Sequence, residues 1–424
     1  MLEAGGGRFR RLLADDLVRH GAIVFVAQGL VNVLNFAFHV LVSRRLGVDA
    51  YGTLNALIAG FTMLAVPSAI ATTIVVKYAA EFRAVGDFAR LRALTLRILS
   101  VLGLTALGVF ALGSLLAPLF AGFFHVDGIA PVVLTVGVLS LNVVVPVLRG
   151  VFQGVEDFRA FAISVLIETV AKLVLAFAFT AWGLGLDGAL AAWLLGALAS
   201  FIWTAAVLVN AYRHEDAAPL RLDYERLART SAAVAVATLC IASLSYSDVV
   251  IVKHVFDSRT AGLYAAAALA GKILFWLVAF VPTILLPRAI HRAATGKPVI
   301  GVLLQAMAVI AVFAGSGLLL FAFAARAVVG ALFGAAYLGA APLLFPYGIA
   351  TTLLAILNTV SVYKIGVHRF GFVIPLAVVA LIELIAVALF HESAFQVIRI
   401  VIAGDAAGLV VVLVATPESR APGP

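Results

Sequence analysis

The sequence predicts an all-α integral membrane protein with about twelve transmembrane helices in two lobes of six helices each. Hydrophobic residues make up 64% of the 424 residues, charged residues make up 12%, and the mean hydropathy is +1.15. In a soluble domain, roughly a quarter of all residues are charged. The low charged fraction therefore excludes a soluble globular protein. Apolar runs of about 20 residues, long enough to cross a bilayer, account for almost the whole chain.

Twelve of these apolar runs are predicted to span the membrane. They cover residues 21–43, 53–78, 94–120, 130–152, 159–182, 186–210, 229–253, 261–288, 299–328, 336–362, 370–390 and 394–416. Residues 1–20 are expected to form a cytoplasmic amphipathic segment, because Phe9, Leu12 and Leu17 share one helical face among arginines. Residues 417–424 are expected to be a short disordered tail.

The basic residues predict the orientation of the chain. With these spans, 21 Lys and Arg residues fall on the side that holds the N-terminus, five fall on the opposite side, and three lie within spans. Loops rich in Lys and Arg stay in the cytoplasm. Both termini are therefore predicted to be cytoplasmic, and the number of spans is predicted to be even.

Residues 211–228, the longest polar connection, divide the chain near its midpoint. They are charged, contain Pro219, and are predicted to be a cytoplasmic linker between an N-terminal lobe, residues 21–210, and a C-terminal lobe, residues 229–416. Gly52 and Gly262 each open an even-numbered span in two weakly similar stretches. An internal duplication with parallel topology accounts for the similarity between the two stretches.

The first span carries a polar stripe along one helical face. Gln28, Asn32, Asn35 and His39 are separated by four, three and four residues, which places them on the same side of an α-helix. Amide and imidazole groups are costly in hydrocarbon. Two interpretations follow: the stripe lines a water-filled cavity, or it forms hydrogen bonds between helices.

Seven charged residues lie well inside apolar runs, where the cost of a charge in the bilayer makes each a functional candidate, provided that a partner or water is present. They are Glu168, Lys172, Asp248, Lys272, Glu383, Arg399 and Asp405. Glu168 and Lys172 are four residues apart, so they are predicted to form either a structural ion pair or part of a transport site. Lys272 has no acid within helical reach. Asp248 is predicted to pair with Lys272 or to bind a coupling cation.

Prolines within apolar runs predict kinks, and the motifs of common enzymes are missing. Pro67 and Pro282 lie within such runs, where a kink serves either as a hinge or as a fixed bend.

The phosphate-binding loop, metalloprotease and serine-hydrolase signatures are missing, and His and Cys residues do not cluster at metal spacing. We therefore expect neither an enzyme nor a nucleic-acid-binding protein. No cofactor is expected apart from a coupling Na⁺ or H⁺.

Several stretches resemble the polysaccharide-exporter branch of the multidrug/oligosaccharidyl-lipid/polysaccharide exporter superfamily, which includes O-antigen flippases. The resemblance covers roughly residues 20–390. It is carried by LVSRRLGVDAYGTLNAL, KYAAEFRAVGDFARLRAL, LRGVFQGVEDFRAFA, IETVAKLVLAFAFTAWGLGLDGALAA and SDVVIVKHVFDSRTAGLYAAAALAGKIL. It implies a V-shaped, twelve-helix transporter of the bacterial inner membrane that flips a polyprenyl-pyrophosphate-linked oligosaccharide by alternating access.

The resemblance also implies which residues line the central cavity, because helices one, two, seven and eight surround it in that family. These residues are Gln28, Asn32, Asn35, His39, Lys77, Lys253 and Lys272. Asp248, Glu168 and Glu383 are the candidates for ion coupling. The expected partners are the lipid-linked glycan, membrane lipids, and a polysaccharide polymerase with glycosyltransferases. Lipid II flippases of the same superfamily usually have two further helices.

Two other functions remain compatible with the sequence. One is an ion-coupled exporter of small organic cations, which would use the intramembrane acids Asp248, Glu168 or Glu383. The other is a membrane scaffold of a polysaccharide assembly complex that transports nothing. Contact of the polar stripe with sugar hydroxyls or water would favour the flippase, with phosphate bound by Lys77 or Lys272.

Overall fold

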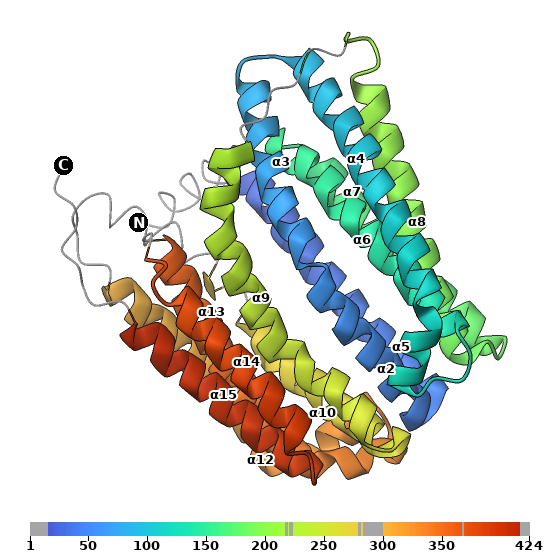
Figure 1. Ribbon diagram of the computed structural model, residues 1–424, viewed down its shortest axis with the longest axis vertical. Helices are drawn as coiled ribbons and strands as arrows, with labels where there is room; N and C mark the ends of the chain where they lie inside the picture. Colours follow the sequence, from blue (N-terminus) through green and yellow to red (C-terminus); the bar gives the residue numbers. More distant parts are fainter. Residues whose placement is uncertain are drawn as a thin grey trace, which may run out of the picture. The chain divides into compact units, whose positions relative to one another are not determined.

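The computed structural model of the protein is helical, with no strand in any residue that it describes (Figure 1). The structure describes residues 16–216, 219, 224–278, 281–282, 300–366 and 369–415. The predicted amphipathic segment 1–20 and tail 417–424 fall mostly or wholly outside these ranges. The fold class predicted from hydropathy, an all-α multi-pass membrane protein, is confirmed.

The structure describes fourteen helical elements within these ranges. They are α2 (Asp16–Leu64), α3 (Val66–Ala84), α4 (Phe88–Leu115), α5 (Ala117–Phe124), α6 (Ala130–Gly154), α7 (Phe158–Ala181), α8 (Gly185–Ala211), α9 (Tyr224–Val255), α10 (Ser258–Leu277), α12 (Ile300–Leu332), the 3₁₀ helix η1 (Ala335–Ala340), α13 (Ala341–Gly366), α14 (Val373–Leu389) and α15 (Ala394–Val414). Aspartates cap three of them: Asp87, Asp157 and Asp257 each accept a hydrogen bond from a backbone N–H of the first turn.

Every one of the twelve predicted spans overlaps at least one helix. Within the described residues, nine helices are long and apolar enough to cross a membrane, or ten if the broken pair α2 and α3 is one span. The apolar helix α14, at 17 residues, is shorter than each of these nine helices. Most of the part of the eighth predicted span that follows Leu277 lies outside the described residues.

Helix α2 contains the first predicted span and the start of the second. Gly47 interrupts it with a backbone φ of 77° and ψ of 177°, a conformation that glycine adopts without the steric cost of a β-carbon. The helix ends at Leu64, and α3 begins at Val66, directly before Pro67. The kink predicted at Pro67 therefore coincides with a break between two helices, as expected for a residue that cannot donate a backbone hydrogen bond.

The chain forms two compact units that differ from the predicted contiguous lobes. Unit 1 contains residues 1–45, 67–121 and 127–224, and unit 2 contains residues 46–66, 122–126 and 225–424. The last boundary falls within the predicted linker 211–228. The prediction of lobes 21–210 and 229–416 needs correction because two segments of the first half, residues 46–66 and 122–126, pack with the second half.

Close packing of two glycines explains why residues 46–66 belong to unit 2. A β-carbon on Gly52 would lie 2.7 Å from both Cα and N of Gly262, and a β-carbon on Gly262 would overlap the carbonyl oxygen of Val48. Only glycines allow α2 and α10 to approach this closely. Tyr51, which is fully buried, adds ring contacts to Tyr337 at a centroid distance of 5.9 Å.

Each unit has its own apolar core. In unit 1, Leu91, Leu148 and Phe152 are among the buried residues that join α4 and α6 to their neighbours. In unit 2, Leu357, Phe372 and other buried residues join α9, α13, α14 and α15. These cores fix the helices that carry the intramembrane polar residues.

Replacing Gly262 with alanine tests the glycine contact. The new methyl group overlaps the Val48 carbonyl, so we expect a loss of about 2 kcal/mol of stability, within the usual range for overpacking. Gly315→Ala in α12 is the matched control, because nothing lies within 4 Å of a β-carbon there. Thermal unfolding of the purified proteins measures both changes; equal melting temperatures would contradict the role of Gly262.

Candidate functional site

The polar stripe of α2 is divided by the structure into an exposed part and a partly buried part. Gln28 and Asn32 are exposed, and the Gln28 amide Nε2 donates to the Asn32 side-chain oxygen at 3.2 Å. Asn35 and His39 are partly buried. Asn35 accepts a hydrogen bond from Lys172 of α7. Asn35 thus makes the hydrogen bond between helices that was one of the two interpretations of the stripe, and the cavity lining stays a prediction.

Lys172 is the centre of a buried site in unit 1. Its side chain is 6% exposed, and its ammonium Nζ donates to Asn35 Oδ1 at 2.5 Å. The same nitrogen lies 4.8 Å from the ring centroid of Phe38 and 4.9 Å from that of Trp193. Cation–π contacts stabilise a desolvated ammonium by about 2 kcal/mol or more. The ammonium of Lys172 on α7 therefore contacts side chains of both α2 and α8.

Glu168 is bound to Arg149 of α6 and not, as the spacing predicted, to Lys172. Arg149 Nη2 donates to Glu168 Oε2 at 2.6 Å, and the two side chains are 11% and 17% exposed. The predicted pair Glu168 and Lys172 is therefore corrected. The i,i+4 rule describes an isolated helix, whereas here a planar guanidinium from a neighbouring helix fits the carboxylate better than an ammonium does.

Hydroxyl groups complete the surroundings of Arg149. Its Nε donates to Ser164 Oγ at 2.8 Å, and its Nη2 lies 2.7 Å from Ser200 Oγ. The Ser164 hydroxyl also lies 2.7 Å from the hydroxyl of Thr204. This network joins α6, α7 and α8 and provides hydrogen-bond partners for the charged group of Arg149. The count of basic residues on each side of the membrane had placed Arg149 at the cytoplasmic end of the fourth predicted span.

Asp248 is the buried acid at the centre of unit 2. It is 0% exposed, and its Oδ2 accepts hydrogen bonds of 2.7 Å from the hydroxyls of Tyr264 and Tyr347. Its second oxygen, Oδ1, has no hydrogen-bond donor among the described residues. Helices α9, α10 and α13 therefore meet at one carboxylate that keeps a free acceptor.

Glu383 of α14 and Asp405 of α15 lie near Asp248. They are 2% and 1% exposed, and none of their four carboxylate oxygens has a hydrogen-bond donor in the described part of the chain. A β-carbon on Gly404 would overlap Glu383 Oε2, so the backbone of α15 passes directly beside that carboxylate. The three acids interact electrostatically with one another. Buried carboxylates without donors need a bound proton or a cation.

Lys272 does not form the predicted ion pair with Asp248. Its ammonium lies 3.7 Å from the ring centroid of Tyr246, and no described acid forms a salt bridge with it. The two tyrosine hydroxyls on Asp248 take the place that Lys272 was expected to fill. Lys272 is partly exposed as a residue, and the Tyr246 ring is the contact that the structure gives its ammonium.

The other predicted lysines have different surroundings. Lys77 is exposed and lies 3.9 Å from Glu81 in a surface pair on α3. Lys253 is 2% exposed and donates to the hydroxyl of Ser258 at 3.0 Å, at the junction of α9 and α10. Two cavities of about 790 and 660 Å³ are lined by other residues.

Sequence reasoning missed Arg149, Tyr264 and Tyr347 as members of these sites. Arg149 was counted with the cytoplasmic residues because it lies near the end of an apolar run, and nothing in a single sequence shows which tyrosine faces a buried acid. A metal centre is not found: in the part of the chain that the structure describes, no three His, Cys, Asp or Glu side chains converge on one point.

These features define a multi-pass helical membrane protein, in which intramembrane charges are held by residues from several helices. A family model described as "Polysaccharide biosynthesis protein" matches residues 17–290. The chain therefore belongs to this family.

One curated relative is "Stage V sporulation protein B" of Bacillus subtilis (strain 168), which is 24% identical over 226 residues. The match covers 50% of this chain and 42% of that relative. The chain thus spans less than half the length of the curated relative that it matches.

Solved structures confirm the fold. A multidrug resistance MATE family transporter of the MOP superfamily, in an inward-facing conformation, aligns with a TM-score of 0.75 and 13% identity over 91% of this chain and 92% of its own. The lipid II flippase MurJ in an inward closed conformation aligns with a TM-score of 0.69 and 13% identity, over 92% and 86% of the two chains.

Removing Arg149 tests the ion pair of unit 1. Arg149→Met leaves Glu168 without its partner in a largely buried position, so we expect a loss of about 3 kcal/mol. The double variant Arg149→Met with Glu168→Gln removes both charges and should recover part of this loss. Unfolding of the purified variants measures the difference. A single variant as stable as the parent protein would contradict the structural role of the pair.

Proposed function

We propose that the protein is a flippase that moves a polyprenyl-pyrophosphate-linked oligosaccharide across the bacterial inner membrane. Membership of the polysaccharide biosynthesis family carries this proposal, because the family match covers residues 17–290. The fold shared with a lipid II flippase supports it. Alternating access of the two units moves the head group without covalent chemistry, both termini lie in the cytoplasm, and a polymerase and glycosyltransferases act on the same glycan.

The polar residues have separate roles in this proposal. Gln28, Asn32 and His39 are suited to sugar hydroxyls, because amide and imidazole groups both donate and accept hydrogen bonds. Lys77 and Lys272 are suited to the pyrophosphate. Lys77 is an exposed residue, Lys272 is a partly exposed one, and Lys272 has no salt bridge with a described acid. Lys253, which is buried beside Ser258, holds the α9 and α10 junction near this path.

We also propose that transport is coupled to a proton or Na⁺ that is taken up by one or two of the buried acids Asp248, Glu383 and Asp405. Buried carboxylates are costly unless they are neutralised, and five of their six oxygens have no donor among the described residues. A proton or Na⁺ neutralises them, and release of the cation leaves charges that favour another arrangement of α9, α14 and α15. Glu168 is less suited to this role because Arg149 already neutralises it.

An exporter of small organic cations is the second candidate. The MATE family transporter with a TM-score of 0.75 favours it, as do the buried acids of unit 2. The two functions differ in the charge of the substrate. Proteoliposomes that take up a fluorescent polyprenyl-pyrophosphate oligosaccharide but do not transport ethidium would support the flippase. The opposite result would support the exporter.

Replacing Lys272 with methionine tests pyrophosphate binding. Loss of a hydrogen bond to a charged group costs about 1.5–3 kcal/mol, so translocation of the lipid-linked oligosaccharide should fall by roughly 10- to 100-fold. Arg399→Gln, which removes an exposed charge from α15, is the control and should leave transport unchanged. Unchanged transport by the Lys272 variant in the same proteoliposome assay would remove Lys272 from the substrate path.

Replacing the acids of unit 2 with amides tests the coupling cation. Glu383→Gln and Asp405→Asn imitate the neutral carboxyl groups, so the proteins should fold and retain their melting temperatures. Transport should no longer respond to an imposed Na⁺ or pH gradient, and the gradient to which the parent protein responds identifies the ion. Glu392→Gln, an exposed residue before α15, is the control. Variants that respond to the gradient as the parent does would contradict coupling at this site.

A further inference from the structure

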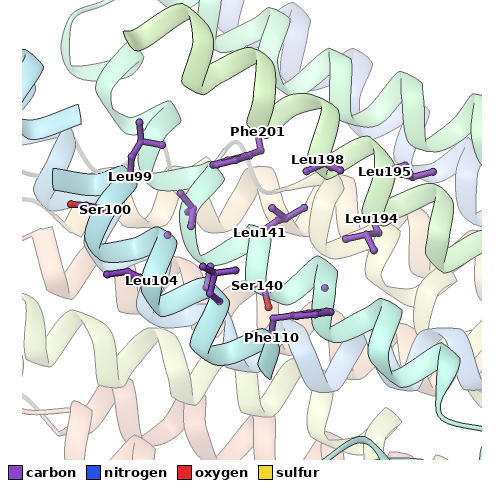
Figure 2. A pocket seen from close by; sticks show the side chains of 15 residues that line it. Leu99, Ser100, Leu104, Phe110, Ser140, Leu141, Leu194, Leu195, Leu198 and Phe201 are labelled. Carbon is purple, nitrogen blue, oxygen red and sulfur yellow. The ribbon is translucent and has the colours of Figure 1, made fainter. Parts of the chain in front are cut away.

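Unit 1 contains an apolar groove on the surface formed by α4, α6 and α8, and neither the proposed transport path nor the coupling site uses it. The groove has a volume of about 790 Å³. Figure 2 shows Leu99, Leu104 and Phe110 along α4, with Leu198 and Phe201 along α8. The third helix, α6, packs against both of these helices and contributes Leu141 and Ser140.

The groove is open, and its walls are exposed in the complete chain. Leu104 is 70% exposed and Leu198 is 38% exposed. Helices α4, α6 and α8 are all long and apolar enough to cross a membrane. Exposed leucines on such helices face hydrocarbon, because water would not solvate them favourably. The occupant of the groove must therefore be apolar along this length.

The length of the groove matches one leaflet of the bilayer. Leu99 and Phe110 mark its two ends on α4, and at 1.5 Å per residue they are about 16 Å apart along the helix axis. This is about half of the roughly 30 Å hydrocarbon core. An acyl chain of a phospholipid has this length, whereas a helix that spans the membrane would extend well beyond the groove.

Positive charge lies beyond the Leu99 end of the groove. Arg92 is two helical turns before Leu99 and shares its face of α4. It is partly exposed and donates to the backbone carbonyl of Glu215, just after the end of α8, so it connects the two helices that border the groove. Arg97 and Arg213 are exposed at the same end, together with the acids Glu215 and Asp216.

We propose that this groove binds one acyl chain of an anionic glycerophospholipid, with its phosphate at Arg92. An apolar slot one leaflet long, with an arginine about 10 Å beyond its Leu99 end, complements a hydrocarbon chain that is joined through glycerol to a phosphate. Arg92 uses one N–H group on Glu215, and the guanidinium has further donors for phosphate oxygens. The bound lipid holds α4 against α8 in unit 1.

Two glycines of α4 provide a matched pair of variants. Gly103 lines the groove and Gly108 does not, and nothing lies within 4 Å of a β-carbon at either position. Gly103→Phe therefore fills the groove without a clash, whereas Gly108→Phe adds the same side chain to an exposed position outside it. Equal melting temperatures and elution volumes of the two variants verify that both fold.

The experiment is native mass spectrometry of the full-length protein, titrated with palmitoyl-oleoyl phosphatidylglycerol. We expect one tightly bound lipid per chain, with affinity about tenfold lower for Gly103→Phe, which corresponds to the loss of roughly two methylene contacts. Gly108→Phe should bind like the parent protein. Arg92→Gln should lose the preference for phosphatidylglycerol over phosphatidylcholine, whereas Arg90→Gln, which changes the arginine that pairs with Asp87, should retain it.

Three results would overturn the proposal. The first is equal lipid binding by Gly103→Phe and Gly108→Phe. The second is tight binding of undecaprenyl phosphate at the groove without binding of phosphatidylglycerol, which would assign it to a polyprenyl lipid. The third is a dimer that Gly103→Phe dissociates, which would assign the groove to a second copy of the chain. Because Arg92 also holds the carbonyl of Glu215, the glycine pair decides the question if Arg92→Gln does not fold.

Discussion

Charge within hydrocarbon is the constraint on which the rest of this structure depends. Each intramembrane charge has to be neutralised by another helix, by an aromatic face or by a bound ion. Unit 1 meets this need internally, since Arg149 holds Glu168 and aromatic rings surround Lys172. Unit 2 does not, because Glu383 and Asp405 have no donor among the described residues. The two units share a helical architecture, but within the described residues only unit 2 contains buried carboxylate oxygens without a hydrogen-bond donor.

Hydropathy predicted the fold well because bilayer thickness sets helix length. All twelve predicted spans overlap helices, and the break near Pro67 follows from the missing backbone donor. The sites were less predictable. Spacing along one helix placed Glu168 beside Lys172, but the partner of Glu168 comes from α6, and the donors to Asp248 come from α10 and α13. Contacts between helices are not encoded in the periodicity of either helix alone.

The weak similarity between the stretches around Gly52 and Gly262 has a physical basis in the packing of unit 2. Gly52 and Gly262 were recognised as equivalent positions in similar stretches, and the structure shows that they contact each other. A small residue needed at both sides of a close helix contact explains why the same pattern occurs twice. The contact also explains the error in the domain prediction, since a repeat in sequence does not require each copy to pack only within its own half.

The glycine contact also determines how the chain can assemble during synthesis. Residues 46–66 emerge early, but their partner α10 begins only at Ser258, so the second part of α2 has to wait for about 200 residues before its packing surface exists. A chain cut at residues 211–228 would give one fragment with an unpacked helix and another without part of its core. Neither half is an independent folding unit, and any split form of the protein has to assemble around this shared segment.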